Sequence, residues 1–353
     1  MIAGLSISKN SYQALVLSVL GIALVLIMLL SLSLGAYAIP FSSVLAILGE
    51  QFGLSLEGVD RSAANVLLQI RLPRIIIALL IGGGLGIAGA ALQGLFRNPL
   101  VEPGLIGVSS GSALFAVVFI VLIPGLAGSS NLIQNLGMPL FAFLGGLTHV
   151  WAVYQLARTQ GRTDTATLIL AGVAINALAG ALIGLTLFFA DDSALRSFTF
   201  WSLGDLGASS WSKFPVAISL IGIPSIMLML EYRNLNALSL GEREAFHMGI
   251  SVQRVKIKIL ILSALIVGVG VSLAGMIGFV GLVVPHLIRI GFGANHRLVL
   301  PASFLLGAIL LNVADLMART VVSPAELPIG VLTALIGAPF FIYLIFKLNK
   351  INS

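Results

Sequence analysis

The sequence predicts an all-α, polytopic integral membrane protein with about ten transmembrane helices, organised as a single transmembrane domain over residues 1–353. Only 9% of the residues are charged and 58% are hydrophobic, whereas an ordinary soluble domain has about 25% charged residues. The mean hydropathy is +1.10. Apolar stretches of about 20 residues, which cross a bilayer core about 30 Å thick, recur along the chain. So few polar side chains cannot cover a chain of this length in water.

Composition also excludes several functions. Without cysteine the chain has no disulfide, thiolate metal site or thiol nucleophile. The four histidines show no metal-ligand spacing, so we expect no metal site. The net charge is +6, but the basic residues are scattered over short loops and form no stripe interleaved with aromatic residues, which argues against nucleic-acid binding.

The predicted spans are uncharged apolar stretches, which lie at 14–34, 75–95, 104–123, 136–157, 168–190, 214–230, 259–288, 298–314 and 327–346. Ala36-Tyr37-Ala38 after the first stretch resembles a signal-peptide cleavage site. About 20 apolar residues exceed the roughly 7–15 of a signal peptide, so we expect an uncleaved helix. The stretch 259–288 has 30 residues, or about 45 Å as a helix, which is long for one span and short for two. Hydropathy alone therefore leaves nine or ten spans open.

The distribution of basic residues decides between nine and ten spans, because Lys and Arg collect in cytoplasmic loops. If 259–288 is split in two and the N-terminus is cytoplasmic, 13 basic residues lie inside and 6 outside. With nine spans the distribution becomes 10 to 9, which is no bias. We therefore predict ten spans, with both termini cytoplasmic.

A weak inverted repeat is also predicted. Ala88-Gly89 is followed by Pro99, and Ala274-Gly275 is followed at the same spacing by Pro285. With ten spans, the two glycine-rich helices run in opposite directions, as in the inverted repeats of many transporters. A chance match of three residues is the alternative explanation.

The segment RLPRIIIALLIGGGLGIAGAALQGLFRNPLVEPGLIG, which starts at Arg71, is the most informative in the chain. Its glycines predict close packing between membrane helices. A phosphate-binding loop would need a Gly-x4-Gly-Lys-Ser/Thr pattern, which occurs nowhere in the sequence. We therefore expect that the chain is not an enzyme and does not hydrolyse ATP.

Several motifs in order resemble the permease family of ABC importers for iron-siderophores, haem and cobalamin. They are RLPR, GLFRNPLVEPGLIGVSSG, WSLGDLGASSW, LSLGEREAFHMGISV, GFVGLVVPHLIR and ELPIGVLTALIGAPFF, and the likeness extends from about Ala36 to Lys347. The resemblance implies ten helices per subunit and a dimer of permeases, homodimeric or formed with a close relative, in the lipid of a bacterial inner membrane. It also implies two separate ATPase subunits, which hold ATP-Mg, and a periplasmic substrate-binding protein. No cofactor is expected in this chain.

Arg71 and Arg319 fall at the outer ends of predicted helices, against the positive-inside trend. One interpretation is structural, in which Arg71 anchors a helix end and Arg319 pairs with Asp315 one turn earlier. The resemblance implies instead that both receive acidic side chains of the docked binding protein, to which an arginine can bind through two hydrogen bonds. We favour docking.

The loop 234–258 is the longest predicted cytoplasmic segment. Periodicity predicts a short helix over Leu240–Met248, a stop at Gly249 and a second helix from near Val252. Its apolar residues are more than a solvated connector needs. The resemblance implies that the loop couples the permease to the ATPase. The residues that match the family's pattern, with Met248 where Leu is commoner, are Leu240, Gly241, Glu242, Ala245, Met248 and Gly249.

The resemblance also implies cytoplasmic gates of the translocation pathway in two segments, one at Asn98, Pro99 and Leu100 and one at Asp164 and Thr165. An Asn-Pro pair is also a common turn, and the two interpretations are compatible.

Ionisable residues are scarce inside the predicted spans, where Asp315 is nearly alone. This scarcity argues against an ion-coupled secondary carrier, which needs a buried titratable relay. A purely structural membrane protein would leave the loop 234–258 unexplained. The segments LFRNPLVEPGLIGVSSG and LRSFTFWSLG look most like the haem branch of the family. We therefore predict alternating-access import of haem or another iron chelate, with a ferric siderophore or cobalamin as the alternative substrate.

Overall fold

The computed structural model describes residues 9–51, 53, 60–123, 131–159, 162, 163 and 165–352. Within these residues the chain is helical, apart from turns and a hairpin of two short strands, β1 (Arg158–Thr159) and β2 (Arg162–Thr163). The prediction of an all-α membrane protein is confirmed.

Seven described helical segments are long and apolar enough to cross a membrane. They contain α1 (Lys9–Ser33), α3 (Arg61–Asn65) continuing through Val66–Arg71 into α4 (Leu72–Phe96), α6 (Asn131–Ala157), α7 (Thr165–Phe188), α9 (Phe214–Ala217) continuing into α10 (Ile223–Leu230), α13 (Val252–Ala274) and α15 (His296–Ala318). Shorter or partly apolar helices complete the ten spans, namely α5 (Val108–Leu122), α14 (Val280–Phe292) and α16 (Ile329–Asn352).

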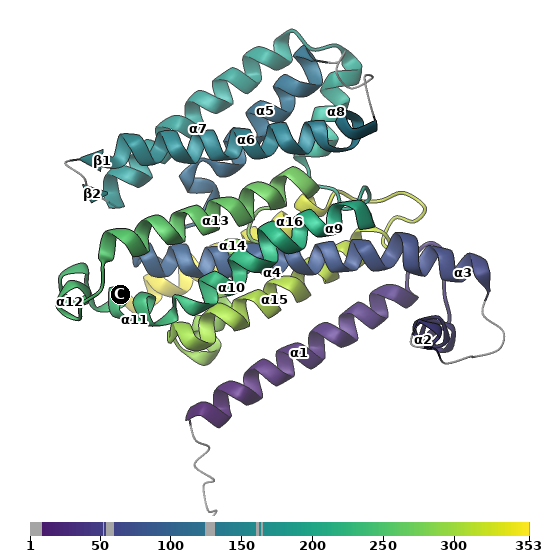
Figure 1. Ribbon diagram of the computed structural model, residues 1–353, viewed down its shortest axis with the longest axis horizontal. Coiled ribbons are helices and arrows are strands. Elements are labelled where there is room, and N and C mark those ends of the chain that lie inside the picture. Colours follow the sequence, from purple (N-terminus) through teal and green to yellow (C-terminus); the bar gives the residue numbers. More distant parts are fainter. Residues whose placement is uncertain are drawn as a thin grey trace, which may run out of the picture.

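Among the described residues, further short α-helices connect the spans, namely α2 (Phe41–Glu50), α8 (Asp192–Ser202), α11 (Tyr232–Leu240) and α12 (Glu242–His247). In Figure 1, α11, α12, the hairpin, the start of α1 and the C-terminus lie at one end of the bundle, and α2, α3 and α8 lie at the other. We call these the α12 end and the α3 end. The two described chain ends therefore share one end of the bundle, as an even number of spans requires.

The 30-residue stretch 259–288 is divided, as the charge distribution predicted. Helix α13 ends at Ala274, and Gly275 follows with φ +70°, a conformation that favours glycine. The chain then runs without helix to Phe279, and α14 begins at Val280. The stretch thus contributes to two helices.

Helix α4 is almost entirely buried and runs through the middle of the bundle, against α1, α13, α14 and α15 (Figure 1). Its glycines lie directly on neighbouring backbones. A Cβ atom built on Gly86 would be 2.2 Å from the carbonyl oxygen of Ser303, and one on Gly89 would be 1.9 Å from that of Gly281. The predicted packing role of these glycines is therefore confirmed.

The residues of the weak inverted repeat occupy unequal settings, although the helices that carry them are antiparallel. Gly89 lies within α4, whereas Gly275 ends α13. Pro99 lies in a turn, whereas Pro285 lies inside α14. The three-residue match therefore marks no repeated local structure.

Candidate functional site

The α12 end carries the loop predicted to couple the permease to an ATPase. Helix α11 ends at Leu240, and Gly241 separates it from α12 with φ +134° and ψ 153°, a backbone conformation essentially restricted to glycine. Gly249 follows α12 with φ +83°, and α13 begins at Val252, as predicted. The predicted helix over Leu240–Met248 is therefore shorter than expected, because Gly241 interrupts it.

The apolar residues of this loop divide into two groups. Leu238 and Ala245 are buried and hold the loop against the bundle. Leu240, Phe246 and Met248 are 67%, 69% and 62% exposed. Three large apolar side chains that point away from the protein at a polar end of the bundle are typical of a surface that another protein covers.

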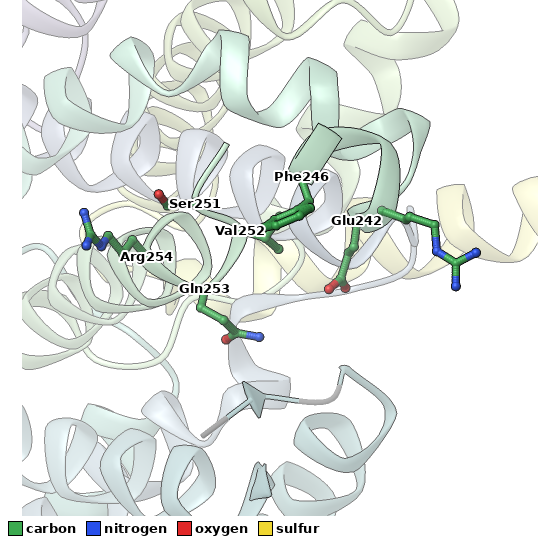
Figure 2. Close-up of a pocket in the computed structure, with 7 residues that line it drawn as sticks. Glu242, Phe246, Ser251, Val252, Gln253 and Arg254 are labelled. Atoms are coloured by element: carbon green, nitrogen blue, oxygen red, sulfur yellow. The ribbon is translucent and has the colours of Figure 1, made fainter. Parts of the chain in front are cut away.

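A hollow of about 520 Å³ lies between α12 and the start of α13. Figure 2 shows the ring of Phe246 beside Val252, with Glu242 from the start of α12 pointing into the same space. The carboxylate of Glu242 pairs with Lys256 of α13 at 2.7 Å, and the Lys256 side chain is only 6% exposed. This ion pair, buried on the Lys256 side, joins α12 to α13.

Arg71 lies at the α3 end, where α4 begins, and its side chain is buried. Its guanidinium donates to the carbonyl oxygens of Leu32 at 2.5 Å, Ser33 at 3.1 Å and Tyr37. Leu32 and Ser33 form the end of α1, where the last carbonyls have no partner within the helix. Arg71 therefore caps α1.

Arg319, which follows α15, caps the same helix end. It donates to the carbonyl oxygen of Ser31 at 2.7 Å and to that of Leu34 at 3.0 Å. It also pairs with Asp315 at 3.3 Å, so the structural pairing considered from the sequence is confirmed. Docking of a binding protein at Arg71 and Arg319 stays a prediction.

Sequence reasoning missed Arg74, which pairs with two carboxylates at the α3 end. Arg74 lies 2.8 Å from the fully buried carboxylate of Asp315 and 2.9 Å from that of Glu326. The RLPR motif could have indicated Arg74, because Arg71 and Arg74 are three residues apart and therefore lie on one face of a helix. Asp315 is thus shared by Arg74 and Arg319.

Exposed charges also lie at this end. Asp60 caps α3, and the backbone N–H of Ser62, followed by the hydroxyl of Tyr37, holds the pKa of Asp60 below its usual range. Arg61 is exposed next to it.

The first predicted gate segment is a turn after α4. The side-chain oxygen of Asn98 accepts a hydrogen bond from the backbone N–H of Leu100 at 2.9 Å, and Leu100 is 47% exposed. Asp164 lies outside the described residues, and Thr165 is the first residue of α7. The turn is confirmed, and the gate stays a prediction.

Comparison with known proteins gives the family. The profile of the FecCD transport family matches residues 23–347. The chain belongs to the FecCD transport family. It is 43% identical over 343 residues to the hemin transport system permease protein HmuU of Yersinia pestis, covering 96% of this chain and 97% of the relative. It is 35% identical over 312 residues to the vitamin B12 import system permease protein BtuC of Vibrio vulnificus, covering 88% and 92%.

A solved structure described as an inward-facing conformation of a metal-chelate type ABC transporter has a similar fold. The TM-score is 0.80 at 36% identity, over 94% of this chain and 98% of the other. This member of the FecCD transport family is a multi-pass permease subunit of an ABC importer, a transport component and not an enzyme. The family implies ATPase and binding-protein partners.

Proposed function

We propose that two copies of this chain form the translocation pathway of a haem importer in the bacterial inner membrane, with both termini in the cytoplasm. The hemin transport permease of Yersinia pestis matches almost the whole chain at 43% identity, which supports haem over cobalamin. A ferric siderophore or cobalamin is the alternative, since cobalamin and vitamin B12 permeases match at 35–41% identity over 79–88% of this chain.

The exposed apolar face of Leu240, Phe246 and Met248 carries the coupling part of the proposal. The ATPase covers this face, and nucleotide-driven movement of the ATPase passes through α12 to α13 by the Glu242–Lys256 pair. Gly241 and Gly249 permit the turns on either side of α12, and Ala245 packs beneath it.

At the α3 end, the binding protein delivers its ligand beside Arg71 and Arg319. At the α12 end, the segment Asn98, Pro99 and Leu100 and the segment at Asp164 and Thr165 close the pathway. The dimer alternates between outward and inward openings, each favoured by a different partner or nucleotide state.

Reconstitution tests this function directly. The chain, its ATPase and its binding protein in liposomes should take up haem only when ATP is present. Uptake driven by a proton gradient without ATP would show a secondary carrier instead. ATP turnover measured with haem, a ferric siderophore and cobalamin in turn identifies the substrate, because only the transported ligand on its binding protein accelerates turnover.

A further inference from the structure

Glu102 lies far deeper in the protein than its place in a loop after α4 indicates. A Cβ atom built on Gly281 would be 3.0 Å from the ring of the next residue, Pro103, and 3.1 Å from the carbonyl oxygen of Leu85, so Pro103 lies level with Leu85. Leu85 precedes the end of α4 at Phe96 by eleven residues, which is about 16 Å of helix. The chain after α4 therefore turns back along the helix, and Glu102 lies inside the helical bundle and not at its end.

The Glu102 carboxylate is half-buried and holds the interruption between α13 and α14. Its Oε1 accepts a hydrogen bond from the backbone N–H of Phe279 at 3.2 Å. None of the ion pairs in the described part of the chain includes Glu102. An acidic residue at this depth without a cation is rare in membrane proteins and usually has a function.

The hydrogen bond to Glu102 comes from Phe279, a residue whose backbone conformation is strained. It has φ +67°, a left-handed conformation that is unfavourable for a bulky residue, and it caps the start of α14. Its side chain packs against Gly337 of α16, where a Cβ atom would be 2.4 Å from the Cβ of Phe279. The non-helical residues 275–279 are thus held by contacts from other segments.

These contacts lie between α12, in the proposed coupling loop, and the predicted gate segment, which are the two parts that move in the proposed transport cycle. Helix α13 joins the interruption to α12 and is tethered to α12 by the Glu242–Lys256 pair. Glu102 is two residues after Leu100 of the predicted gate segment. We propose that Glu102 is a positioning residue that couples movement of the α13–α14 interruption to the gate segment through its bond to Phe279. This inference rests on the proposed function, since it assumes the coupling loop and the gate.

Three substitutions separate the hydrogen bond from the charge. Glu102→Gln keeps the acceptor oxygen and loses the charge. Glu102→Asp keeps the charge but is one methylene shorter, so it does not reach the Phe279 N–H. Glu102→Met fills a similar volume with no comparable acceptor. If the bond matters, uptake per ATP hydrolysed stays within about twofold of wild type for Gln and falls about three- to tenfold for Asp and Met, the range expected for loss of one such hydrogen bond.

A labelling measurement reports on the gate itself. Because the chain has no cysteine, Leu100→Cys gives a single site for a membrane-impermeant maleimide applied from the cytoplasmic side. The labelling rate should change with nucleotide in the wild-type and Gln backgrounds, and this response should disappear in the Asp and Met backgrounds. Assembly with the ATPase, measured by co-purification, should be equal in all four proteins.

Two results overturn the inference. One is a normal uptake-to-ATP ratio and a normal labelling response in the Asp and Met variants. The other is a Gln variant as impaired as Met, because the charge and not the hydrogen bond would then matter. If Met does not assemble, the comparison of Gln with Asp still decides. Failure of wild-type ATP-driven uptake would contradict the proposed function instead, and the two failures are distinguishable.

Discussion

At the α12 end, Leu240, Phe246 and Met248 face away from the protein, whereas at the α3 end Arg71 and Arg319 are turned into it. Each group reverses the usual preference, in which apolar side chains are buried and charged ones are exposed. The physical causes differ. The arginines donate to carbonyl acceptors at the end of α1, whereas no segment within the described residues covers the apolar side chains.

This difference indicates how each end meets a partner. A surface that is already apolar and exposed needs little change to bind an ATPase. Arginines that already donate to backbone carbonyls must share or release those bonds to bind an acidic side chain. In the proposed function, coupling would use a preformed surface, while docking at Arg71 and Arg319 would compete with the cap of α1.

Removing Asp315 should have the largest effect, because it breaks the charge cluster at the α3 end. Asp315→Ala leaves Arg74 and Arg319 buried without their shared carboxylate. Loss of one partner of a buried pair costs about 3–5 kcal/mol, so we expect a large drop in the thermal unfolding temperature of the purified protein.

The matched control is Glu326→Gln, which removes the other carboxylate beside Arg74. The side chain of Glu326 is 44% exposed, and exposed pairs contribute about 1 kcal/mol or less. Equal destabilisation by both variants would contradict the central place of Asp315 in the cluster.

Charging the exposed apolar face should weaken ATPase binding without unfolding the permease. Phe246 is 69% exposed, so Phe246→Asp should leave the unfolding temperature unchanged. An aromatic residue at the centre of an interface contributes about 2 kcal/mol, so co-purification with the ATPase should weaken about thirtyfold. Phe246→Leu keeps an apolar side chain and should bind nearly normally. ATPase binding by the Asp variant at wild-type strength would show that another surface makes the contact.

The two glycines that flank α12 should respond differently to the same substitution. Gly249 has φ +83° and open space around it, and asparagine tolerates the left-handed region, so Gly249→Asn should support normal uptake. Gly241 has φ +134°, which asparagine adopts only with strain of about 1–3 kcal/mol. Gly241→Asn should therefore lower ATP-driven uptake about tenfold. Equal activities in the uptake assay would mean that α12 does not need its present orientation.

The parts that could be predicted from sequence are those that depend on local pattern and on charge. The division of 259–288 followed from the distribution of Lys and Arg, and the stop at Gly249 followed from the usual role of glycine after a helix. The interruption at Gly241 was missed because glycine also occurs inside membrane helices, as in α4.

The contacts that could not be predicted join residues far apart in the chain. Arg71 meets carbonyls nearly forty residues away in α1, and any residue type supplies a carbonyl, so the sequence holds no sign of the cap. Glu102 stands between the predicted spans 75–95 and 104–123, and no pattern in the sequence marks its position in the fold. Its depth depends on the chain turning back along α4, where Gly281 makes room for Pro103.

The smallest expected effects separate the capping role of Arg71 from its predicted docking role. Arg71→Lys keeps the positive charge, but one ammonium group cannot reach the carbonyls of Leu32, Ser33 and Tyr37 together. Loss of one or two of these bonds should cost about 1–2 kcal/mol of stability, seen as a lower unfolding temperature. Binding-protein affinity should stay within about threefold, because Lys keeps the charge that would steer an acidic partner to this end.

Charge reversal then completes the comparison. Arg71→Glu and Arg319→Glu should weaken docking of the binding protein about tenfold and, because both side chains are buried, should also lower the unfolding temperature. The proposed ATPase contacts lie at the opposite end of the bundle, so whatever variant protein stays folded should still assemble with the ATPase. Arg61→Glu is the matched control, since Arg61 is exposed at the same end and has no place in the cap of α1. If reversal at Arg61 weakens docking as strongly as reversal at Arg71, the binding protein responds to the general charge of the α3 end. Arg71 and Arg319 would then serve only to cap α1. A specific contact with a partner protein would be confined to the α12 end of the bundle.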